Sequence, residues 1–72
     1  MKIRTLDVSG LEPPGPIQEI IKELNYIDDE TILIVIHKRE PCLLYPVLEK
    51  NGFDYSLEEK EGQFHIQIRK KK

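Results

Sequence analysis

Five ionisable side chains are the part of this sequence best suited to chemistry, and they lie in two short segments. They are Asp7, Glu12, His37, Arg39 and Glu40. An imidazole changes charge near neutral pH, a guanidinium binds anions through paired N–H groups, and carboxylates accept protons or hydrogen bonds. The set can form one site only if the fold brings the two segments together.

The segments follow two predicted strands. Apolar and polar side chains alternate over residues 2–8, which predicts a strand that stops at Ser9 and Gly10. Residues 32–36 form an unbroken apolar run rich in β-branched types, which is typical of a buried central strand within residues 31–37. Ligands of α/β sheets bind beyond the carboxyl ends of parallel strands. We therefore expect the loops after these two strands to lie side by side.

Two helices and a hairpin complete the chain. Pro16 suits the first position of a helix, and the apolar residues behind it have helical spacing, at Ile17, Ile20, Ile21 and Leu24. A second helix is predicted to start between Leu43 and Pro46, with Pro46 in its first turn, and to end at Asn51-Gly52. Alternating segments from Phe53 and from Phe64, joined by a turn containing Gly62, predict an antiparallel hairpin.

The element order β-α-β-α-β-β predicts a single α/β domain over residues 1–72, a two-layer sandwich with both helices on one face of the sheet. The unbroken apolar run places the second strand between the first and the fourth. Its side chains alternate between two faces, so either Leu33 and Val35 or the neighbouring isoleucines have no helix above them. Two interpretations of that uncovered set stay open: a stripe shielded by long neighbours, or a surface for a dimer or partner.

Composition narrows the class of protein. Eleven Lys and Arg residues against 13 Asp and Glu give a net charge of −2, which argues against a dedicated nucleic-acid binder. The lone Cys42 excludes an internal disulfide, and one thiol with two histidines does not make a closed zinc site, so no metal or cofactor is expected. No apolar run is long enough for a membrane span, and no secretory signal opens the chain. We expect a cytoplasmic protein.

The segment Leu6-Asp7-Val8-Ser9-Gly10-Leu11-Glu12-Pro13-Pro14-Gly15-Pro16 resembles the opening of TusA/SirA-like sulfur carriers, whose signature is Leu-Asp followed by Gly-Leu-x-Cys-Pro-x-Pro. The resemblance continues through the element order. It implies a mixed four-stranded sheet in the order 1-2-4-3 with the fourth strand antiparallel. The sulfur-accepting cysteine of that signature is replaced by Pro13, so a persulfide cannot form at this position.

A branch without this cysteine, the family called domain of unknown function 2249, is more similar. It shares Leu-Asp-Val-x-Gly-Leu-Glu-Pro-Pro-x-Pro, seen here from Leu6 to Pro16. It also shares His-x-Arg-Glu-Pro after the second strand, seen here from His37 to Pro41, with Leu44-Tyr45-Pro46 following. The resemblance implies the same fold and no settled activity.

Each candidate site residue has a structural alternative. Glu12 either contacts a ligand or complements the positive end of the first helix. His37 serves as an acid–base group or metal ligand, or simply caps its strand with the ring bonded to a carboxylate. Arg39 binds an anion or pairs with Glu12 or Glu40. Since carboxylates outnumber arginine in the cluster, we expect the pKa of His37 to be raised.

We expect a binding module for a small ligand or a protein partner at Glu12, His37, Arg39 and Glu40, in a monomer or weak dimer. No nucleophile–base pair stands out, so no catalytic residue is assigned and an enzyme is not favoured. Two alternatives stay open. One is a sulfur-transfer accessory that uses Cys42. The other is an RNA-binding domain, because the fold resembles the C-terminal domain of a translation initiation factor and the chain ends in three lysines, Lys70 to Lys72.

Overall fold

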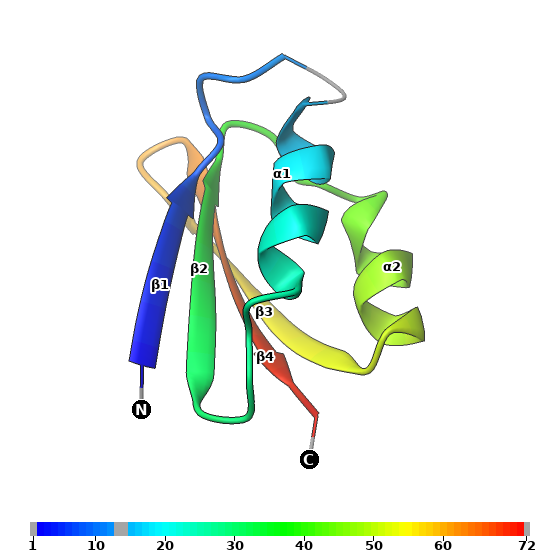
Figure 1. Ribbon diagram of the computed structural model, residues 1–72. Coiled ribbons are helices and arrows are strands. Elements are labelled where there is room, and N and C mark those ends of the chain that lie inside the picture. The colour runs from blue at the N-terminus through cyan, green and yellow to red at the C-terminus, as the bar shows by residue number, and fades with distance from the viewer. Residues whose placement is uncertain (1, 13–14, 72) are drawn as a thin grey trace.

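Six elements follow one another in the predicted β-α-β-α-β-β order (Figure 1). The structure is a computed structural model, and it describes residues 2–12 and 15–71. The elements are β1 (Lys2–Asp7), α1 (Gly15–Leu24), β2 (Thr31–His37), α2 (Leu44–Lys50), β3 (Phe53–Lys60) and β4 (Gln63–Lys70). Position 13, where the sulfur carriers have their cysteine, lies outside the described residues. No helix in the described ranges is long and apolar enough to cross a membrane.

The four strands form one mixed sheet in the order β1-β2-β4-β3. Strands β1 and β2 are parallel, and β4 is antiparallel to both of its neighbours, β2 and β3. The register places Leu6 beside Val35, and Val35 beside Ile66. The predicted strand order and the central position of β2 are confirmed.

Both helices cover the same face of this sheet, as predicted (Figure 1). The β2 side chains on that face, Leu33 and Val35, are fully buried, and so are Ile66 and Ile68 of β4. The helices close the core from above with a third set of buried side chains, Ile20, Leu24, Leu44 and Leu48. Because α1 and α2 contribute to one cluster, they must lie on one side of the sheet.

The opposite face of the sheet has no helix over it. The three isoleucines that β2 presents there, Ile32, Ile34 and Ile36, are only half-buried. In the register, Thr5 and Gln67 flank the middle isoleucine, Ile34, on its two sides. Neighbouring side chains therefore shield part of the stripe, and a dimer or partner at this face stays a prediction.

Helix α1 begins at Gly15, one residue before the predicted start, and buries a narrower stripe than its spacing suggested. Ile20 and Leu24 are buried and Ile17 is half-buried, but Ile21 is 42% exposed. The prediction that Ile21 is a core residue is wrong. Successive helix positions differ by about 100°, so with Ile20 directed at the sheet its neighbour lies beyond the edge of the contact. Its side chain lines the space beside α2 instead.

Helix α2 begins at Leu44, within the predicted interval, so Pro46 lies in the first turn, where a missing N–H costs no helical hydrogen bond. The predicted end is confirmed. The backbone N–H of Asn51 donates to the carbonyl of Val47 at 3.1 Å, and Gly52 has a φ of +79°. That left-handed conformation favours glycine and turns the chain directly into β3.

A side-chain contact between β1 and α1 holds the helix against the edge of the sheet. The Nε of Arg4 donates to Oε2 of Glu23 at 3.0 Å, and its Nη2 lies 2.9 Å from the same oxygen. The guanidinium also lies over the ring of Tyr26, 5.5 Å from the centroid. This contact links β1 to the C-terminal part of α1.

The different burial of two adjacent isoleucines gives a direct test of the packing. We expect Ile20→Ala to lower the free energy of unfolding by about 2–5 kcal/mol, because it leaves a cavity in the core. Ile21→Ala is expected to cost less than about 1 kcal/mol, because its side chain is already partly in water. Urea unfolding of both variants measures this, and equal losses would show that α1 is rotated about its axis relative to this structure.

Candidate functional site

A cavity of about 330 Å³ lies beyond the carboxyl end of β2. The start of α1, the loop from β2 to α2 and the start of α2 form its walls. Its lining residues are Pro16, Ile17, His37, Arg39, Glu40, Pro41, Cys42, Leu43 and Leu44. The lining is mostly apolar with a few polar groups, and the volume lies at the lower end of the range of small-molecule sites, about 300–1,000 Å³.

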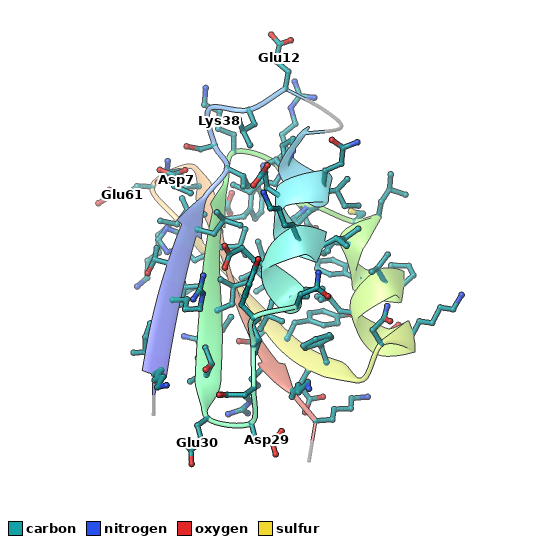
Figure 2. All side chains as sticks on the ribbon, viewed as in Figure 1. Asp7, Glu12, Asp29, Glu30, Lys38 and Glu61 are labelled. Carbon is teal, nitrogen blue, oxygen red and sulfur yellow. The ribbon has the colours of Figure 1, made fainter. Side chains whose placement is uncertain are left out.

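Three of the four predicted ligand-binding residues line this cavity, namely His37, Arg39 and Glu40. The fourth, Glu12, is not among its lining residues in the described part of the chain. Its side chain is exposed at the far end of the β1–α1 loop and points away from the body of the protein (Figure 2). The backbone N–H of Gly15 donates to the carbonyl of Glu12 at 2.8 Å, so the loop turns back toward α1 at this residue. A ligand-binding role for Glu12 stays a prediction.

Asp7 has a local partner instead of a place in the cavity. Its Oδ1 accepts hydrogen bonds from the backbone N–H of Ser9 at 2.9 Å and from the Ser9 hydroxyl at 2.6 Å. The hydroxyl bond, and then the backbone bond, lower the pKa of this carboxyl group. Asp7 therefore stabilises the turn that ends β1, the usual role of an Asp side chain bonded two residues on.

His37 is the last residue of β2, and its ring is fixed by the loop that follows. The backbone N–H of Arg39 donates to Nδ1 of His37 at 3.1 Å. Burial, and then the positive charge of Arg39, lower the pKa of the imidazole. The expectation of a raised pKa is wrong, because burial disfavours the charged ring and the nearby charge that acts on it is that of Arg39 rather than of a carboxylate. Since Nδ1 accepts, the neutral ring carries its proton on Nε2.

Arg39 and Glu40 are both exposed, and the salt bridges of the described residues include neither of them. The expected ion pair of Arg39 with Glu12 or Glu40 is therefore not formed. Two backbone bonds hold the loop, from the N–H of Cys42 to the carbonyl of Glu40 and from the N–H of Leu44 to the carbonyl of Pro41, both at 2.9 Å. The loop is thus shaped by its backbone, and both charged side chains are available to a ligand.

The apolar lining of the cavity is not among the predicted site residues. Helical spacing predicts Ile17, Leu43 and Leu44 as parts of the apolar helix stripes, but Leu43 lies just before α2 and is 81% exposed. Their common signal is position: each lies in the first turn of a helix, or just before one, that starts at the carboxyl edge of the sheet. Leu44 completes the core, whereas Leu43 does not, and an exposed apolar residue at this edge of the sheet indicates a ligand site.

Tyr45, in the first turn of α2, is not one of the predicted site residues. Its ring stacks in parallel on that of Tyr55, with the centroids 4.7 Å apart. Its hydroxyl is buried and has no hydrogen-bond partner among the described residues. Burial, followed by the charge of Glu40, raises the pKa of this hydroxyl. The Tyr45 hydroxyl is thus a buried polar atom without a partner in the described structure.

Cys42 is exposed and lines the same cavity as His37. No hydrogen bond joins the two side chains in the described part of the chain, and Nδ1 of the ring is already occupied by the backbone. An activated thiol needs such a base or a cationic neighbour in contact with it. Among the described residues, no group of three His, Cys, Asp or Glu side chains is placed to hold a metal ion.

The environment of His37 predicts a specific pH dependence. We expect its pKa, measured from the ring protons by NMR, to lie below the ordinary value of 6.5. The folded state then binds this proton less readily than the unfolded state, so the contribution to stability is present above pH 6.5 and is lost as pH falls through the folded pKa. His37→Gln should remove this part of the pH dependence of urea unfolding. A folded pKa above 6.5 would contradict the observed contacts.

Residues 5–70 match the family described as "Uncharacterized conserved protein (DUF2249)". This range contains every residue that lines the cavity. It agrees with the resemblance carried by the segments Leu6 to Pro16 and His37 to Pro41. No curated protein and no solved structure matches the chain. The protein belongs to the DUF2249 family of uncharacterized conserved proteins.

Proposed function

We propose that this protein is a non-catalytic binding module that takes a small, largely apolar ligand into the cavity beyond β2. The observation that carries the proposal is the cavity itself, about 330 Å³ in volume and lined by apolar side chains with a few convergent polar groups. Its place at the carboxyl end of a central parallel strand is where α/β sheets bind their ligands. A cytoplasmic location and the absence of catalysis belong to the same proposal.

The sequence also suggested a relation to the TusA/SirA-like sulfur carriers, and this relation supports a second candidate function. The strand order β1-β2-β4-β3 with two helices on one face is the arrangement that the resemblance implies. Cys42 is exposed at the cavity and is the chain's single thiol. A sulfur-transfer accessory would carry a persulfide at Cys42. Incubation with a cysteine desulfurase and intact-mass analysis would then show the mass of one added sulfur.

The RNA-binding alternative has a separate test. Lys70 and Lys71 are exposed at the end of β4, and Lys71 lies 4.0 Å from the carboxylate of Asp54. Binding to RNA would weaken steeply with added salt and would be lost when Lys70 to Lys72 are deleted. Unchanged affinity after the deletion would exclude this tail as an RNA contact.

The binding-module proposal is tested with N-phenyl-1-naphthylamine, a neutral apolar probe that becomes fluorescent in apolar surroundings. We expect the wild-type protein to bind it and to lose this binding when N-ethylmaleimide is attached to Cys42, because the adduct fills the mouth of the cavity. Unlabelled Cys42→Ser should fold normally and bind the probe like the wild type, since this thiol makes no hydrogen bond in the described structure.

Cys42→Ser treated with N-ethylmaleimide is the matched control, and it should retain binding. Full probe binding by the labelled wild-type protein would place the probe elsewhere and contradict the proposal. No binding by the unlabelled protein would contradict it as well. Loss of sulfur transfer on Cys42→Ser would favour the sulfur-relay alternative instead.

A further inference from the structure

Two residues that carry hydrogen-bond donors, His37 and Arg39, line the cavity at the end of β2. The Nδ1 of His37 already accepts the backbone N–H of Arg39, so the free ring nitrogen, Nε2, carries the proton and donates. The guanidinium of Arg39 makes no ion pair or side-chain hydrogen bond within the described residues. The backbone of Arg39 is bonded directly to the His37 ring, and both residues line the cavity.

The acidic residue that lines the described cavity is Glu40, the neighbour of Arg39 in the sequence. The two opposite charges are adjacent in the sequence but do not form a salt bridge with each other. Neither Nε2 of His37 nor the guanidinium of Arg39 has an acceptor among the hydrogen bonds and salt bridges of the described residues.

We propose that the ligand is a small amphiphilic anion, whose apolar body packs against Ile17, Pro41 and Leu43 and whose anionic group accepts hydrogen bonds from Arg39 and His37. This inference rests on the function proposed above and names the chemical class of the ligand. The class includes carboxylates and sulfonates on an aromatic or aliphatic body.

Two physical arguments favour this class over a neutral or a purely ionic ligand. A guanidinium presents a planar set of N–H donors that matches a carboxylate or sulfonate, and such charge-assisted bonds are about twice as strong as neutral ones. The apolar body of a bound ligand displaces water from beside the donors and so strengthens the attraction. An ion without an apolar body would leave the walls uncovered, and a neutral apolar molecule would gain nothing from Arg39.

The test compares two probes that differ by one anionic group, 8-anilinonaphthalene-1-sulfonate and the neutral N-phenyl-1-naphthylamine. We expect Arg39→Gln to weaken binding of the sulfonate about tenfold, which corresponds to one lost charge-assisted hydrogen bond, and to leave binding of the neutral probe unchanged. Lys38→Gln is the matched control. It removes the same charge one residue away, on a side chain that does not line the cavity in the described structure (Figure 2).

Glu40→Gln should strengthen binding of the sulfonate, since it removes the only like charge that lines the described cavity. Each variant is first checked for cooperative urea unfolding, because the sulfonate probe also binds loosely packed states. Both probes should be displaced when N-ethylmaleimide is attached to Cys42.

The possible failures are distinguishable. If the neutral probe binds in the cavity but Arg39→Gln leaves the affinity for the sulfonate unchanged, the anionic class is wrong and the binding module stands. If Arg39→Gln and Lys38→Gln weaken binding of the sulfonate equally, the probe is attracted only by the overall charge of the protein. The proposed contact with Arg39 is then wrong. If neither probe binds the wild-type protein, the proposed function itself fails.

Discussion

Strand β2 is paired along both edges, by β1 on one side and β4 on the other, and the rest of the structure depends on this position. Burying Leu33 and Val35 requires a helical layer above them. The chain leaves β1 for β2 and β2 for β3 in the same direction across the sheet, so two right-handed crossovers deliver both helices to the same face. The core is then closed by α1 and α2 together.

The same arrangement creates the cavity. Both helices begin at the edge of the sheet where β2 ends, and their first turns enclose the loop between β2 and α2. His37 is still part of the paired strand, so its ring starts from a rigid position. The bond from the N–H of Arg39 to this ring then fixes the beginning of the loop. A site built in this way needs little ordering when a ligand binds, which favours affinity.

The His37 ring is the most constrained polar group of the cavity. Burial and then the charge of Arg39 lower the pKa of its imidazole, and its Nδ1 accepts the backbone N–H of Arg39. Cys42 shares the cavity but has no base bonded to its sulfur in the described structure. The uncovered isoleucine stripe on the opposite face is a separate feature, in which Thr5 and Gln67 flank the half-buried Ile34. The stripe and the cavity share β2, which carries Ile34 and ends at His37.

The sequence by itself determined the element order, the central place of β2 and the end of α2 at Asn51 and Gly52, because these follow from local periodicity and from backbone conformations that few residues adopt. It also placed His37, Arg39 and Glu40 at one edge of the sheet, because His37 ends β2 and the other two residues follow it directly. The tertiary structure alone decided that Ile21 lies outside the core, that Glu12 points away from the cavity and that the pKa of His37 is lowered. The burial of a side chain, the direction of a loop and the surroundings of a ring depend on how the elements pack together. The spacing of residues within a single element carries no information about that packing.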